Sequence, residues 1–190
     1  DSTFSTGRRG IAGTVFVHKI AGAAAEAGKS LAEVKAAAQK VIDNVRSMGM
    51  AMSSCILPGV GKPGFQLAEN EMELGMGIHG ESGINREAMC SAKDVARKLV
   101  DPILADLDYS GSEVAVMVNG LGGTPLMELY IMYNEVEALL SARNIRIYRC
   151  FVGSYMTSLE TSGCSVTMLR LDDELKPLLD APANTPAFKV

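Results

Sequence analysis

Short apolar runs alternate with longer segments of helical periodicity from about residue 48 onward, and this order constrains the fold more than any other feature of the chain. The order is strand, strand, helix, strand, helix, strand, strand, helix. Such an order is typical of an α/β protein with a mixed sheet. Because three helices cannot easily cover both faces of about six strands, we expect a mostly two-layer domain whose second face meets another domain or subunit.

The first 45 residues have a different pattern and predict helices alone. Gly28 follows a helix-forming stretch at 11–27, as a glycine just beyond a helix end does. Ser30 and Glu33 have the spacing of a capping box. The apolar positions that follow recur at helical spacing: Leu31, Val34, Ala38, Val41, Ile42 and Val45. We therefore expect a second helix here, before the sheet begins.

Composition and charge exclude several classes of protein. Hydrophobic residues make up 47% of the chain and charged residues 21%, an ordinary globular balance. The net charge of −4 and the lack of Trp argue against a nucleic-acid surface. No apolar run is long enough for a transmembrane helix. The cysteines have neither zinc nor disulfide spacing, and we expect all of them to be small buried hydrophobes: Cys55, Cys90, Cys150 and Cys164.

The beginning of the chain is similar to an export signal. The stretch "STGRRGIAGTVFVHKIAGAAAEA" has a twin arginine, an apolar run and small residues. However, His18 and Lys19 interrupt the apolar run, and the core of a signal is normally uncharged. We expect His18 to be either a polar surface position or a helix-packing position on a helix. Because the chain begins at Asp1 and not at Met, we expect it to be a piece of a longer protein.

One histidine lies among glycines in "ENEMELGMGIHG". If this stretch is a strand, alternate side chains face opposite sides. Four apolar positions then form a core face: Met72, Leu74, Met76 and Ile78. The opposite face carries Glu71, Glu73 and His79, with Gly75 and Gly77 leaving a hollow beside the imidazole. Two readings remain open, an edge-strand histidine beside solvated glutamates, and a catalytic or ligand-binding imidazole. A shared metal is disfavoured, because Glu73 and Glu71 would lie roughly 20 Å and 27 Å away along a strand.

Two glycine-rich stretches precede predicted helices. Both "TGRRGIAG" and "NGLGGTP" could bind an anion at a helix N-terminus, or could be plain tight turns. Neither has the Gly-Lys-Ser/Thr of a P-loop. No G-x-S-x-G occurs to indicate an esterase nucleophile.

Five segments together resemble, in order, the dihydroxyacetone kinase family, and specifically its substrate-binding K subunit or domain. The segments are "GRRGIAGTVFVHKIAGAAAEAG", "GKPGFQLAENEMELGMGIHGESGI", "VNGLGGTPLMELY", "GSYMTSLETSGCSVTMLRLDDEL" and "DAPANTPA". The resemblance runs from about Thr6 to Ala187, and its "GMGIHGE" motif is specific to the family.

The resemblance implies a role for His79. In the family this imidazole forms a hemiaminal with the carbonyl carbon of dihydroxyacetone, which glycerol cannot do. We expect Gly77 and Gly80 to border the substrate. No cofactor or metal is expected on this chain, since ADP or ATP with Mg²⁺ belongs to the partner L subunit or L domain. The family also implies a homodimer and a cytoplasmic location.

The resemblance further implies how the chain divides. Residues 1–45 would be the C-terminal helices of a three-layer first K domain. Residues 46–190 would be the second K domain, with a tail that would return to the first. The family's acid/base aspartate and lysine lie upstream of the matching part, so we expect this piece alone to be inactive. An alternative within the family is a sensor paralogue, which binds the ketone and co-activates a transcriptional regulator without kinase activity.

Overall fold

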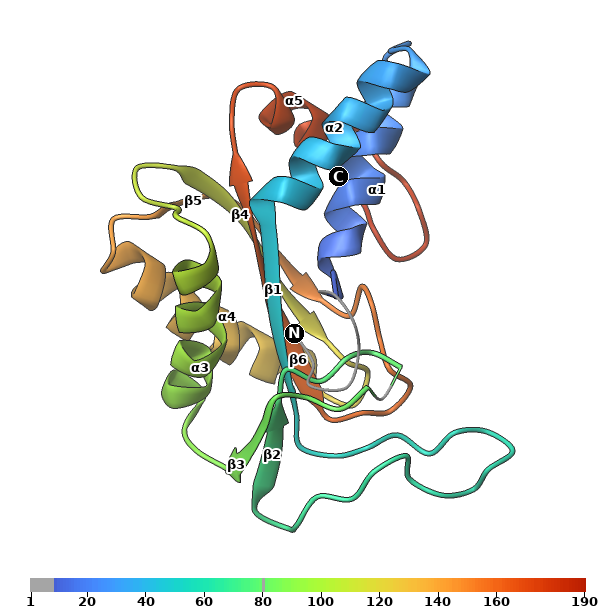
Figure 1. Ribbon diagram of the computed structural model, residues 1–190, viewed down its shortest axis with the longest axis vertical. Helices are drawn as coiled ribbons and strands as arrows, with labels where there is room; N and C mark the ends of the chain where they lie inside the picture. Colours follow the sequence, from blue (N-terminus) through green and yellow to red (C-terminus); the bar gives the residue numbers. More distant parts are fainter. Residues whose placement is uncertain (1–8, 80) are drawn as a thin grey trace.

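The computed structural model describes residues 9–79 and 81–190, which form one six-stranded sheet with helices on both sides (Figure 1). In chain order the elements are α1 (Gly13–Glu26), α2 (Leu31–Asn44), β1 (Val45–Ala51), β2 (Glu71–Leu74), β3 (Asn85–Ala88), α3 (Ala92–Asp106), β4 (Glu113–Gly120), α4 (Leu126–Ser141), β5 (Arg146–Gly153), β6 (Gly163–Leu171) and α5 (Leu175–Asp180). The expected α/β fold with a mixed sheet of about six strands is therefore confirmed.

The strands lie in the order β3-β2-β1-β6-β4-β5. Every neighbouring pair is antiparallel except β4 and β5, which run parallel and are joined through α4. The central ladder pairs β1 with β6 from Val45 opposite Leu169 to Ala51 opposite Gly163. The site discussed below lies next to the β2–β3 edge of the sheet, away from the β4–β5 edge.

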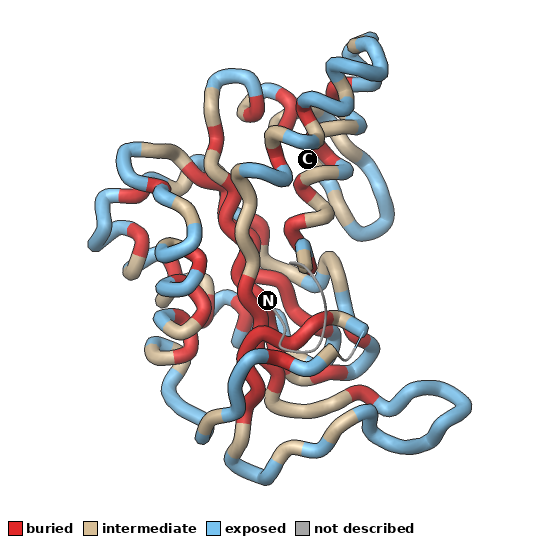
Figure 2. Tube along the Cα trace, in the orientation of Figure 1, coloured by how far each residue is buried: buried red, intermediate tan, exposed pale blue. Residues whose placement is uncertain are grey.

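Apolar clusters lie on both faces of the sheet (Figure 2). On one face α3 and α4 pack over the strands, with Leu99 and Val136 fully buried. On the other face α1, α2 and α5 pack over β4 and β6, where Phe16 and Ile20 belong to one cluster with Leu169. The second face is thus partly covered by helices of this same chain. Whether a domain boundary falls near residue 45 stays a prediction.

Several local predictions are confirmed and some are corrected. Ser30 and Glu33 form the capping box, each bonding the backbone N–H of the other. Gly28 has a φ of 78° beyond α1, a conformation that glycine adopts without strain. A proline, Pro102, lies inside a continuous α3, although a proline in a helix interior usually kinks or breaks the helix. Cys55 and Cys164 are buried as expected, but Cys90 and Cys150 are exposed, because one precedes α3 and the other lies on the edge strand β5.

Between β1 and β2 a long segment, residues 52–70, extends away from the sheet (Figure 1). Its return is tied down by Phe65, which packs against a small cluster that includes Met76 and Leu121. Across the part of the chain that is described, no helix has the length and apolar character needed to cross a membrane.

Candidate functional site

The strand predicted to run through His79 ends early, at Leu74. Gly75 has a φ of 78°, which is outside the extended region, and its N–H donates to Gly49 O at 2.7 Å. The prediction of a continuous strand over 69–79 is therefore wrong, because Gly75 redirects the chain. His79 instead lies in a turn that follows β2, so it does not share a strand face with Glu71 and Glu73.

The apolar residues of the predicted alternation are buried as expected, although the strand ends early. Met72, Leu74 and Met76 are 1%, 5% and 2% exposed. Met76 packs with Ala51 and Leu121 beyond the strand end, and Ile78 is partly buried there. The turn that carries His79 is therefore fixed to the end of the sheet by its apolar side chains.

Glu81 holds the turn from its polar side. Its carboxylate accepts a hydrogen bond from the His79 backbone N–H at 2.9 Å, through Oε2. Its other oxygen, Oε1, lies 3.0 Å from Nδ1 of the His79 ring. The backbone oxygen of Glu81 accepts from Gly77 N–H at 3.1 Å. The His79 side chain is nevertheless 80% exposed, so the imidazole is both held and accessible.

The space beside Gly77 is filled by these side chains. A Cβ at Gly77 would lie 2.2 Å from Glu81 Oε2 and 2.8 Å from Arg9 Nε. Arg9 also donates from Nη2 to Gly75 O at 2.7 Å. The glycine that was expected to leave room for a ligand thus leaves room for the Glu81 carboxylate. A contact of Gly77 with substrate stays a prediction, and Gly80 lies outside the described residues.

Hydrogen bonding also tunes the charge of Glu81. Its partial burial raises the pKa of the carboxyl group, but hydrogen bonds from its own N–H and from the ring and backbone of His79 outweigh burial. The pKa of Glu81 consequently lies below its usual value. The carboxylate facing His79 is therefore ionised at neutral pH.

A second carboxylate, Glu73, supports the far side of the turn. Its side chain is 5% exposed and pairs with Arg86 Nε at 3.1 Å. It also accepts from Gly83 N–H at 2.5 Å. The reading of Glu73 as a solvated surface acid is therefore wrong, since Glu73 is a buried acceptor for the returning chain. Sequence reasoning set Glu73 aside and missed Glu81, although Glu81 follows His79 by only two residues.

The remaining sequence candidates lie elsewhere. In the "NGLGGTP" stretch, a Cβ at Gly123 would lie 2.3 Å from Glu160 O, and Gly123 N–H already donates to Thr161 O. This favours a tight turn over an anion site. In "TGRRGIAG", residues 6–8 lie outside the described part, and Gly10 O accepts from Gly13 N–H in a turn before α1.

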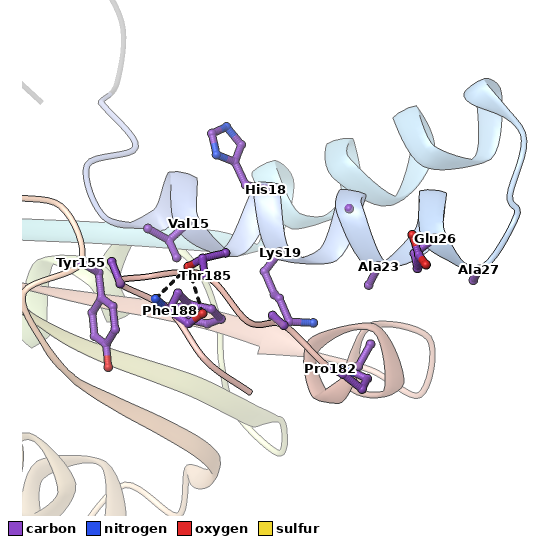
Figure 3. Close-up of a pocket in the computed structure, with 14 residues that line it drawn as sticks. Val15, His18, Lys19, Ala23, Glu26, Ala27, Tyr155, Pro182, Thr185 and Phe188 are labelled. Carbon is purple, nitrogen blue, oxygen red and sulfur yellow. Dashed lines mark hydrogen bonds between the residues drawn. The ribbon is translucent and has the colours of Figure 1, made fainter.

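His18 is exposed on α1, which is the first of the two expected positions, and it lines a cavity of about 890 Å³ between α1 and residues 181–188 (Figure 3). Lys19 also lines this cavity, and its Nζ donates to Leu178 O of α5 at 2.8 Å (Figure 3). His79 is not among the lining residues, so the cavity and the His79 turn are separate features. Among residues 9–79 and 81–190, no group of His, Cys, Asp and Glu could hold a metal ion.

Comparison with known proteins assigns this α/β chain with a mixed sheet to a known family. The Dak1 domain profile matches residues 1–187, and the chain belongs to this family. The PTS-dependent dihydroxyacetone kinase 1, dihydroxyacetone-binding subunit DhaK, of Listeria innocua is 50% identical over 190 residues, covering 99% of this chain and 58% of that protein. The corresponding PEP-dependent subunit of Escherichia coli is 39% identical over 213 residues, covering 99% of this chain and 60% of that protein.

Solved structures agree with the family. The dihydroxyacetone kinase operon co-activator Dha-DhaQ superposes with a TM-score of 0.89 at 34% identity, covering 95% of this chain and 56% of that chain. The dihydroxyacetone kinase from C. freundii superposes with a TM-score of 0.83 at 36% identity, covering 92% of this chain and 32% of that chain. The chain therefore spans little more than half the length of its bacterial subunit relatives.

Proposed function

We propose that this chain is the part of a dihydroxyacetone-binding kinase subunit that carries the covalent substrate anchor, His79. The observation that carries the proposal is an 80% exposed imidazole whose Nδ1 faces a carboxylate. A ring held in this way is accessible to a carbonyl compound, and addition to the carbonyl uses the unprotonated form of the ring. The names of the relatives support dihydroxyacetone as the carbonyl compound.

In the proposed step the Nε2 lone pair forms a bond to the carbonyl carbon. The π pair of the C=O bond moves to the oxygen, which takes up a proton from water, while Nδ1 gives up one proton. The sum is the addition of an imidazole N–H across the carbonyl, without oxidant or leaving group. Glycerol has no carbonyl and cannot form this adduct. The bound ketone then offers a terminal hydroxyl for phosphoryl transfer.

The full-length protein that contains this chain is the material for the test. Dihydroxyacetone labelled with ¹³C at its carbonyl should give a bound tetrahedral carbon signal in NMR spectra. This signal should disappear in His79→Ala and persist in His18→Ala, because His18 is an exposed position on α1. Absence of the signal in the unmodified protein, or its persistence in His79→Ala, would rule out the covalent anchor.

The remaining partners are part of the same proposal. A separate L subunit would supply ADP or ATP with Mg²⁺, the K subunit would be a homodimer, and both would act in the cytoplasm. The word "PTS-dependent" in the names of relatives supports the separate-subunit type. Mixing the full-length protein with an L subunit and a phosphoryl donor should give dihydroxyacetone phosphate, and this piece alone should give none.

A sensor function is the second candidate, because the co-activator Dha-DhaQ superposes with a TM-score of 0.89. Both functions require the ketone to bind at His79. Turnover with an L subunit would exclude a pure sensor, and binding without turnover would favour it.

A further inference from the structure

We infer that Glu81 is a positioning residue for His79: its carboxylate keeps the proton on Nδ1 and thereby leaves Nε2 as the nitrogen that can bond to carbon. The inference deepens the proposed function of His79 and rests on it for its catalytic meaning. Its structural part, the choice of tautomer, can be measured without any substrate.

The two oxygens of Glu81 divide their contacts between the backbone and the ring of His79. Oε2 accepts from the His79 backbone N–H at 2.9 Å, and Oε1 lies 3.0 Å from Nδ1. An ionised carboxylate can only accept hydrogen bonds. Nδ1 must then be the donor, and in a neutral ring the lone pair is on Nε2. The same residue therefore fixes the tautomer and the place of the ring.

The low pKa of Glu81 keeps this arrangement in force at neutral pH, because a protonated carboxyl could itself donate to the ring. The carboxylate also stabilises the positive charge that develops on the ring when Nε2 bonds to carbon. The Glu81 side chain is 31% exposed, so water screens its charge and the stabilisation is confined to the groups next to it.

The surrounding turn is shaped around this carboxylate. Gly77 N–H donates to Glu81 O, and a Cβ at Gly77 would lie 2.2 Å from Glu81 Oε2. The atoms that a Cβ would meet are the ends of flexible side chains, Glu81 and Arg9, and not backbone. A methyl group at position 77 should therefore displace the carboxylate while the chain keeps its fold. Gly77 supports Glu81, and Glu81 in turn supports His79.

Two variants of the full-length protein test the inference from different sides. Glu81→Gln keeps the size of the side chain but replaces one carboxylate oxygen with an NH2 group. If the amide oxygen accepts from the His79 backbone N–H, the NH2 group faces Nδ1 and can only donate, which favours the Nε2–H form. Gly77→Ala keeps the Glu81 carboxylate but pushes it away. Glu69→Gln is the matched control, because Glu69 is exposed and lies before β2.

The primary measurement is the tautomer of His79, read from two-bond ¹⁵N–¹H couplings in protein labelled at histidine. We expect the Nδ1–H form to dominate in the unmodified protein and in Glu69→Gln, and the Nε2–H form to increase in both test variants. The affinity for labelled dihydroxyacetone should fall about tenfold in parallel, by analogy with the lower end of the loss seen when the partner that orients a metal-ligating histidine is removed. A purely structural role for Glu81 would leave the tautomer unchanged.

The possible outcomes separate this inference from the proposed function. An unchanged tautomer in Glu81→Gln, with backbone amide shifts elsewhere preserved, would overturn the positioning role even if His79 binds the ketone. A shifted tautomer in a protein that forms no adduct would support the positioning role and refute the covalent anchor. An Nε2–H form in the unmodified protein would also overturn the inference.

Discussion

The centre of the sheet and its β2–β3 edge are built in opposite ways. In β4 every residue from 114 to 120 is buried, and apolar clusters lie against both faces. At the edge β3 is mostly exposed, and the turn after β2 is held by the carboxylates of Glu73 and Glu81. Apolar burial thus determines where the sheet lies, whereas a few polar contacts determine where the exposed imidazole stands. A substitution in one region should therefore destabilise that region and leave the structure of the other intact.

The largest loss of stability is expected when a buried side chain at the centre of the sheet is shortened. Leu169 is fully buried on β6, within the cluster that joins the sheet to α1. Leu169→Ala should lower the free energy of unfolding by about 2–5 kcal/mol, since it removes apolar contacts and leaves a cavity. Urea unfolding of the full-length protein measures this loss. Leu31→Ala is the control, because Leu31 is 86% exposed, and it should change stability by no more than about 0.5 kcal/mol. Similar losses in both variants would contradict the contrast between buried centre and surface.

A smaller and more local effect is expected at the edge. Glu73→Gln removes the buried charge that pairs with Arg86 and that accepts from Gly83 N–H. The loss should be about 1–3 kcal/mol, as for other hydrogen bonds to charged groups. Hydrogen exchange should quicken at Gly83 while the amides of β4 and β6 stay protected. Glu69→Gln should change neither, and faster exchange throughout the sheet would show that the edge is not a separate unit.

The smallest loss of stability is expected when a surface ion pair is removed, and this pair is the reference for the buried pair of Glu73 and Arg86. Lys40 of α2 pairs with Asp172, which lies ahead of α5. Partial burial raises the pKa of Asp172, but hydrogen bonds from Lys40 and from Leu175 N–H outweigh it, so the pKa lies below 3.8. The contribution to stability is therefore present at neutral pH and is lost as the pH falls through this lowered pKa.

Asp172→Asn should accordingly destabilise the protein at pH 7 by no more than about 1 kcal/mol, because both groups are substantially exposed. The difference from the unmodified protein should vanish in acid, which unfolding curves at several pH values can follow. The neighbouring Asp173→Asn is the control, and it should change stability at pH 7 less than Asp172→Asn does, since the Asp173 side chain is fully exposed. A difference that grows in acid would contradict the assignment.

Most of the fold could be predicted from the sequence because it follows from periodicity and local signals. The capping box at Ser30 and the glycine at 28 mark helix ends by contacts made within a few residues. The placement of α1 and α2 against β4 and β6 could not be predicted in this way. It depends on contacts such as Phe16 with Phe151, whose ring centres are 5.7 Å apart although the residues are far apart in sequence.

The candidate site was predicted less completely. The spacing of glycines around His79, together with the family motif, singled out the imidazole. Alternation then extended β2 too far, because it cannot detect that Gly75 adopts a positive φ. With a strand assumed, Glu81 would lie on the same face as His79 but farther along. Only the turn brings its carboxylate back to the ring. Burial of Glu73 likewise depends on Gly83 and Arg86, which approach from the returning strand.

The β1–β6 ladder has a consequence for the order of folding. Its partners, such as Val45 and Leu169, lie far apart in the sequence, and closing so long a loop costs entropy before the contacts form. The α3–β4–α4–β5 segment is contiguous in sequence and can form first. We therefore expect the ladder to close late in folding. During synthesis the His79 turn would leave the ribosome well before β6. The strand β1, whose Gly49 O accepts from Gly75 N–H at the start of this turn, would gain its β6 partner only afterwards.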